Sequence, residues 1–119
     1  MGIRLLVTGA GGFVAGSILR QFPDAWEVLA LSRGAASLVR PGLTWHTTDI
    51  CDAAQMADVF ESFQPDVVIH AAAIADIDYC EAHQDAAMRV NVTATRHIAE
   101  CCVRHGCRLV YLSTDTVFD

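Results

Sequence analysis

The sequence contains no lysine, and all eight of its basic residues are arginines. This absence excludes a P-loop, because that motif needs a lysine directly after its last glycine to reach the β- and γ-phosphates of a nucleotide. The run from Gly11 to Gly16 has suitable glycines, but Ser17 stands at the lysine position. A glycine-rich phosphate loop in this chain must belong to another class.

Long apolar runs and clusters of basic residues are also lacking. The longest apolar run, Val67–Ala75, is interrupted by His70, and a membrane-spanning helix needs about 18 residues. The net charge is −6 at pH 7 with no basic block, which argues against a nucleic-acid partner. The short apolar run after Arg4 ends too early for a signal peptide. We expect neither a membrane nor a nucleic-acid partner.

The cysteines number five, an odd count, and none of them form a C-x-x-C pair. This usage fits a reducing cytoplasm better than a disulfide scaffold. His97, Cys101 and His105 fall at i, i+4 and i+8 of a predicted helix, a spacing that can present metal ligands. A structural metal site usually needs a fourth ligand, so we interpret the three as an ordinary stripe on a helix surface and predict no metal.

The most informative stretch is LLVTGAGGFVAG, from Leu5 to Gly16, where an apolar strand run meets clustered glycines and then a helix. Gly9 allows a sharp turn after the strand, and Gly12 allows the backbone to approach a pyrophosphate. Ala15 is small enough for close helix–strand packing, and the helix N-terminus offers unpaired N–H groups to an anion. The alternative is a glycine-rich turn that only joins a strand to a helix.

The rest of the chain alternates strands and helices within one domain. The predicted strands are Ile3–Thr8, Trp26–Leu31, Leu43–Thr48, Val67–Ala71 and Cys107–Ser113. The predicted helices are Gly12–Phe22, a segment capped by Asp52 with Gln55 that runs to Phe63, a short turn over Asp78–Ala82, and Asp85–His105 ended by Gly106. Continuous apolar strands favour an α/β fold, a Rossmann-like doubly wound parallel sheet of about five strands.

In such sheets the ligand lies outside the carboxyl ends of the strands, so the residues after each strand are candidates for binding. Ser32-Arg33 follows the second strand, where arginine attracts a 2′-phosphate, and this favours NADP over NAD. The alternative is that Arg33 is a solvated loop residue. Asp49-Ile50 follows the third strand and is placed to bond and pack against adenine, although Asp49 also suits a simple loop turn.

Candidate site residues also follow the fourth and fifth strands. Ala71, Ala72 and Ala73 follow the fourth strand, where small residues let a cofactor lie against the backbone, and His70 is expected to pack in the sheet rather than ionise or bind metal. Ser113, Thr114 and Asp115 follow the fifth strand, where a hydroxyl pair and a carboxylate suit a catalytic group. A capped turn is the alternative there.

These motifs in register resemble the extended short-chain dehydrogenase/reductases, a superfamily of nucleotide-sugar epimerases, dehydratases and reductases. The resemblance rests on VTGAGGFVAG, DICD, DVVIHAAA, RVNVTATRHIAE and LVYLSTDTVFD, and it covers the whole chain. The last motif looks most like the dTDP-4-dehydrorhamnose reductase branch, which typically reads STDYVFDG. Here Thr116 replaces the aromatic residue of that pattern.

The resemblance implies an NADP-dependent reductase of a 4-keto nucleotide sugar, with NAD as the alternative cofactor. It places the pyrophosphate at Gly9, Gly12, Phe13 and Val14, and the 2′-phosphate at Ser32 and Arg33. It places adenine at Asp49 and Ile50, and the middle of the cofactor at Ala71, Ala72 and Ala73. Asn91 and Ser113 complete the cofactor site that the resemblance implies. Asn91 would steady the active site. Thr114 would polarise the substrate carbonyl with help from Asp115.

The principal acid of that superfamily, a tyrosine four residues before a lysine, is missing. Tyr79 and Tyr111 are followed at that distance by His83 and Asp115. We therefore expect residues 1–119 to be the NAD(P)-binding domain, truncated before the tyrosine–lysine pair and the substrate-binding part.

Two alternatives remain open, an NAD-dependent epimerase or dehydratase and a non-catalytic regulatory subunit of the methionine adenosyltransferase type. The resemblance also allows a homodimer paired through the long helix.

Overall fold

A five-stranded parallel sheet runs through the part of the chain that the structure, a computed structural model, describes: residues 2–10, 13–32, 38–71 and 89–111. The strands are β1 (Arg4–Thr8), β2 (Glu27–Ser32), β3 (Leu43–Thr47), β4 (Val67–His70) and β5 (Arg108–Tyr111). Their order across the sheet is β3-β2-β1-β4-β5, and every neighbouring pair is parallel. The predicted α/β class and doubly wound sheet are confirmed.

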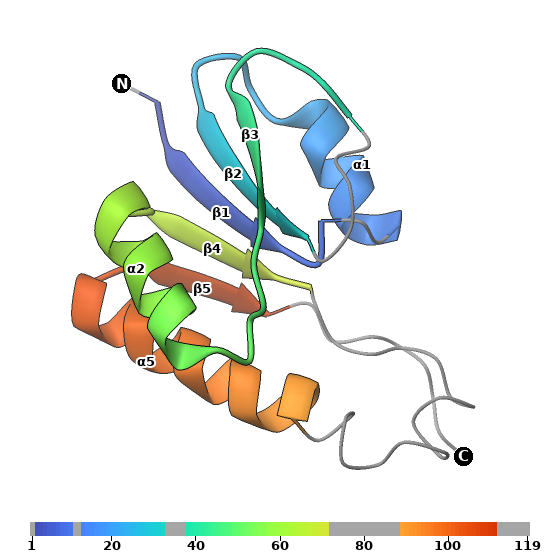
Figure 1. Cartoon of the computed structure of the whole chain (residues 1–119). Coiled ribbons are helices and arrows are strands. Elements are labelled where there is room, and N and C mark those ends of the chain that lie inside the picture. The colour runs from blue at the N-terminus through green and yellow to red at the C-terminus, as the bar shows by residue number, and fades with distance from the viewer. Residues whose placement is uncertain (1, 11–12, 33–37, 72–88, 112–119) are drawn as a thin grey trace.

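Helices cover both faces of this sheet. Helix α1 (Phe13–Gln21) lies on one face, and α2 (Ala53–Phe63) and α5 (Thr95–His105) lie on the other (Figure 1). Successive side chains of a strand point to opposite faces, so Leu5 packs with the α1 layer and Leu6 with the α2 and α5 layer. Because both faces are covered, most residues of β1, β2 and β4 are apolar, as the sequence predicts, whereas the edge strand β3 is largely exposed.

The chain changes direction across the sheet between β1 and β4. From β1 it builds outward through β2 to β3, and α2 then returns it to β4 on the opposite side of β1. Thr8 at the end of β1 is paired in register with His70 at the end of β4. In open α/β sheets this switch point is where a crevice for ligands forms at the carboxyl edge.

The start of α2 follows the cap predicted from Asp52 and Gln55. The Asp52 carboxylate accepts hydrogen bonds from the backbone N–H groups of Ala54 at 3.0 Å and Gln55 at 3.1 Å. The Gln55 side-chain amide donates to the other Asp52 oxygen at 3.0 Å. Two N–H groups that the helix cannot satisfy internally are thereby paired.

Replacing Asp52 with alanine is expected to lower the free energy of unfolding by about 1 kcal/mol, because both N–H groups lose their acceptor. Chemical denaturation measures this change. Asp52→Asn keeps an acceptor and should retain most of the stability, while Asp58→Ala removes the same charge from an exposed position in the middle of α2. A loss at Asp58→Ala as large as at Asp52→Ala would contradict the capping role.

The long helix predicted over 85–105 differs from the structure in its first half. Residues 85–88 lie outside the described part, Arg89–Ala94 form a π-helical turn, η1, and only Thr95–His105 are α-helical. Val90, Val92 and Thr93 are β-branched, which weakens the α-helix locally. The predicted end is confirmed, since Gly106 adopts a left-handed φ of 71° and caps α5.

Candidate functional site

The turn after β1 has the geometry that the glycine pattern predicts. Gly9 has a φ of +64°, in the left-handed region that favours glycine. The N–H of Ala10 donates to the Leu31 carbonyl on β2 at 3.1 Å, which ties the turn to the neighbouring strand. Helix α1 begins at Phe13, so the N–H groups of its first turn have no partner within the helix. An anion is the natural ligand for such a helix N-terminus.

His70 lies at the centre of the same edge and is fully buried. Its Nδ1 is 2.7 Å from the Thr8 hydroxyl oxygen, and its Nε2 is 2.9 Å from the hydroxyl oxygen of Thr95 in α5. The Thr8 oxygen also accepts the N–H of Ala71 at 3.0 Å. On the other side, the Tyr111 ring stacks on the imidazole with a centroid distance of 5.4 Å.

Burial controls the charge of this histidine. Desolvation lowers the pKa of His70 from 6.5 to about 4, so the imidazole is neutral at neutral pH. A neutral ring has one N–H and one lone pair, and a hydroxyl can both donate and accept, so both ring nitrogens are satisfied. The prediction that His70 packs in the sheet is confirmed.

Thr8 and Thr95 were not singled out from the sequence, although both carry a signal. Thr8 is a polar residue that follows the buried apolar run Leu5–Val7 and is itself fully buried. Thr95 precedes the buried Ile98 by three residues and Cys102 by seven, so helical spacing places it on the core side of α5. Polar residues at core positions need partners, and His70 supplies one for both.

The residues proposed for the adenosine end have different surroundings. Asp49 is exposed, and its Oδ1 accepts the N–H of Cys51 at 2.9 Å, which is the loop turn that the sequence left open. Ile50 is 6% exposed and packs in the core layer beside α2 and α5. Ser32 ends β2, where its carbonyl accepts the Thr48 N–H at 3.3 Å. Arg33 lies outside the described residues.

The other predicted site residues are partly described. Ala71 is half-buried directly after β4, where its N–H is held by Thr8. Phe13 and Val14 form the first residues of α1, and Asn91 lies in η1. Those outside the described part are Gly12, Ala72, Ala73, Ser113, Thr114 and Asp115. The structure thus brings Gly9 and Ala71 to one edge of the sheet and places the start of α1 beside them.

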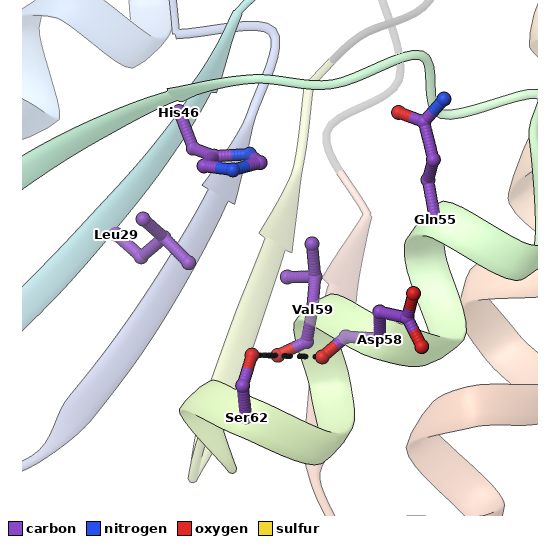
Figure 2. A pocket seen from close by; sticks show the side chains of 6 residues that line it. All are labelled: Leu29, His46, Gln55, Asp58, Val59 and Ser62. Carbon is purple, nitrogen blue, oxygen red and sulfur yellow. Dashed lines mark hydrogen bonds between the residues drawn. The ribbon is translucent and has the colours of Figure 1, made fainter.

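A separate cleft of about 290 Å³ lies between α2 and the strands β2 and β3 (Figure 2). Leu29 and Val59 line it together with side chains of His46, Gln55, Asp58 and Ser62. The Ser62 hydroxyl donates to the Asp58 carbonyl of its own helix at 2.8 Å. This cleft extends along one face of the sheet, and we do not assign it to the nucleotide.

The three residues spaced along the last helix do not form a metal site. Cys101 is buried in the core, and the His105 ring packs against Phe60 with a centroid distance of 5.8 Å. Across the residues that the structure describes, no three His, Cys, Asp or Glu side chains gather closely enough to hold a metal ion. The stripe is also not wholly on the surface, because Cys101 belongs to the core layer.

Comparison with protein families gives a match over nearly the whole chain. The family described as "RmlD substrate binding domain" matches residues 3–119. The chain belongs to this family. In this RmlD-family chain the matched residues include the whole parallel sheet and the loop at Gly9.

Curated relatives of the chain include proteins with different names. A dTDP-4-dehydrorhamnose reductase of Aggregatibacter actinomycetemcomitans is 35% identical over 118 residues, which cover 98% of this chain and 36% of the relative. A methionine adenosyltransferase 2 subunit beta of Danio rerio is 36% identical over 117 residues, covering 98% of this chain and 34% of the relative. The chain spans about a third of the length of these relatives.

Solved structures agree on the fold. The dTDP-4-dehydrorhamnose reductase of Bacillus anthracis, solved in complex with NADP, superposes with a TM-score of 0.83 at 27% identity, over 99% of this chain and 38% of that chain. A hypothetical dTDP-4-dehydrorhamnose reductase of Sulfolobus tokodaii gives 0.82 at 32% identity, over 98% of this chain and 41% of that chain. In the described part of the chain, no helix is both long and apolar enough to cross a membrane.

Proposed function

We propose that this chain supplies the cofactor-binding domain of an NADP-dependent reductase that acts on a 4-keto nucleotide sugar. The observation that carries the proposal is the switch point between β1 and β4, where a left-handed Gly9 follows β1 and α1 begins four residues later. Membership of the RmlD family and the names of the reductase relatives support it. The Bacillus anthracis reductase, similar along this whole chain, was solved with NADP.

The described residues fit a dinucleotide. Gly9 adopts the left-handed conformation of a tight turn, and α1, whose N-terminus has unpaired N–H groups and a positive dipole end, begins four residues later, as a pyrophosphate site would require. Ala71 directly follows β4 and has only a methyl side chain, which leaves room for a cofactor against the backbone. The N–H of Ala10 is already bound to Leu31, so the phosphate donors in this proposal come from Gly12, Phe13 and Val14.

The dinucleotide, when bound, supplies hydride, and this chain's residues bind and orient it. In the proposal, Ser32 and Arg33 hold the 2′-phosphate, Asp49 and Ile50 adjoin adenine, and Ala72, Ala73, Asn91 and Ser113 complete the cofactor site. Thr114 polarises the substrate carbonyl with help from Asp115. The proton donor, a tyrosine–lysine pair, belongs to the remainder of a protein as long as its relatives, since this chain has no lysine.

A non-catalytic subunit is the competing proposal, because the Danio rerio relative is as similar as the reductases are. The reductase relatives and the subunit relatives are both similar to this chain over about a third of their length. Whether the protein is a reductase or a subunit must therefore be tested on the intact protein. Ketone-dependent oxidation of NADPH by that protein supports the reductase. Its absence, together with a stoichiometric enzyme partner in a pull-down, would replace the reductase with the subunit.

The proposed compartment is the cytoplasm. Three cysteines of the described residues are free thiols, namely Cys101, Cys102 and Cys107. Burial raises the pKa of the Cys102 thiol to about 12 and also raises the pKa of Cys101, so these thiols are protonated and unreactive. Free thiols of this kind are typical of proteins kept in a reducing environment.

Arg33→Ala is expected to reduce the preference for NADPH over NADH about tenfold, because the 2′-phosphate loses a charge-assisted hydrogen bond. Dissociation constants for both cofactors, measured by calorimetry on the same preparation, give the ratio. Arg20→Ala is the control, since it removes the same charge from an exposed position on α1. If the ratio is unchanged in Arg33→Ala, the assignment of the 2′-phosphate to Arg33 is wrong.

A further inference from the structure

His70 connects three segments that are distant in the sequence. Through Thr8 it is linked to the residue that precedes Gly9, and through Thr95 it is linked to the first residue of α5. Thr8 in turn holds the N–H of Ala71 at the end of β4. A single buried ring therefore joins the start of the proposed phosphate loop, the β4 end and the long helix.

The geometry leaves this ring little freedom. Both of its nitrogens are bonded, at 2.7 and 2.9 Å, and Tyr111 of β5 stacks against it with an interplanar angle of 20°. Thr8 and His70 are also directly paired across β1 and β4. The sheet fixes the imidazole, and the imidazole fixes the position of Thr95.

Thr95 is the residue at which η1 gives way to α5. A π-helical turn is rare because its backbone geometry is less favourable than that of an α-helix, so it persists only where the surroundings impose it. Ala94 and Ile98 are fully buried on either side of Thr95, which fixes α5 against the core. The hydrogen bond from His70 holds Thr95, the first residue of α5, in place. The residues just before it form η1, which contains Asn91, so the position of η1 depends on this bond.

We propose that His70 is a positioning residue of the dinucleotide site, which holds η1, and with it Asn91, at a set distance from the loop at Gly9. His70 acts through Thr95 and does not itself touch the cofactor. The inference rests on the proposed function for its ligand, but the anchoring of η1 by the His70–Thr95 bond is a property of the free chain. The two are therefore tested by separate measurements.

Thr95→Val replaces the hydroxyl with a methyl group of nearly the same shape and breaks the bond to His70. In the free chain, we expect the backbone amides of residues 89–95 to exchange with deuterium about fivefold faster, as loss of one hydrogen bond predicts. We expect the dissociation constant for NADPH to rise about fivefold as well. Thr95→Ser, which restores a hydroxyl, should return both quantities to within about twofold of the wild type.

Two further variants distinguish the positioning of η1 by His70 from a general loss of stability of the fold. Thr93→Val makes the same substitution within η1, at a threonine outside this network, and should change neither quantity. Thr95→Ala removes the hydroxyl but favours helix formation, so it provides a folded variant if valine lowers the yield. The midpoint of chemical unfolding, recorded for all variants, shows whether an effect is confined to residues 89–95.

The outcomes for the two proposals are distinct. If the wild-type chain binds neither NADPH nor NADH, the proposed function fails, and hydrogen exchange still decides whether His70 anchors η1. If the wild type binds NADPH while Thr95→Val and Thr95→Ala match it in exchange and affinity, the positioning role is overturned and the proposed function stands. An equal effect in Thr93→Val and Thr95→Val also overturns it, because a specific bond would then not be the cause.

Discussion

Acidification from pH 6.5 to about pH 4 is expected to remove about 3 kcal/mol from the free energy of unfolding through His70 alone. The folded chain holds this imidazole with a pKa of about 4, whereas an exposed histidine has a pKa of 6.5. Each unit of pKa difference corresponds to about 1.4 kcal/mol. Between these two values the unfolded chain binds more protons than the folded chain, so stability falls as the pH falls.

The contribution is isolated by comparison with a variant that does not titrate. His70→Gln keeps a donor and an acceptor in one side chain, so we expect a lower stability at pH 7 but a flatter pH profile below pH 6.5. His46→Gln removes an exposed histidine of β3 and should leave the His70 contribution in place. Urea denaturation at half-unit pH steps gives the profiles, and nuclear magnetic resonance follows the ring directly. A midpoint near 6.5 for the His70 ring would contradict the prediction.

The physical cause of this shift is burial without an opposite charge. Thr8 and Thr95 are neutral, and desolvation is the cause of the lowered pKa. A carboxylate at either position would stabilise the imidazolium and push the pKa upward. The two hydroxyls therefore keep the site neutral while still satisfying both ring nitrogens.

Much of this fold follows from local pattern. The largely apolar run Val67–Ala71 after Pro65-Asp66 predicts a buried strand, and Gly106 predicts the end of α5, because both signals depend on nearby residues. The Asp52–Gln55 pair likewise predicts the start of α2. The position of Gly9 at the switch point follows once the strands are recognised as parallel, since their carboxyl ends share one edge.

Other features depend on contacts that no local pattern contains. A π-helical turn and an α-helical turn differ by one residue, and η1 ends just before Thr95, whose hydroxyl is hydrogen-bonded to a residue 25 positions earlier. Ile50 shows the same limit, because an apolar residue after a strand can equally pack against a base or in the core. The packing of α2 and α5 decides its place, and Ile50 lies in the core layer.

Gly9→Val is expected to weaken NADPH binding about a hundredfold. Gly9 has a φ of +64°, and holding a β-branched residue in that region costs about 1–3 kcal/mol. The turn can relieve this strain by leaving the left-handed region, which moves the N-terminus of α1 away from the phosphates. Losing two charge-assisted hydrogen bonds of about 1.5–3 kcal/mol each is enough for a hundredfold change.

Gly106→Val provides the matched control for backbone strain. Gly106 has a similar φ of +71°, and a Cβ placed there meets nothing within 4 Å. It precedes β5, at the amino edge of the sheet, so its replacement should lower the unfolding midpoint while leaving the dissociation constant for NADPH unchanged. Calorimetric titration and denaturation of both variants separate the effects. If both lose affinity equally, strain alone explains the result, and the turn at Gly9 has no special part in holding the dinucleotide.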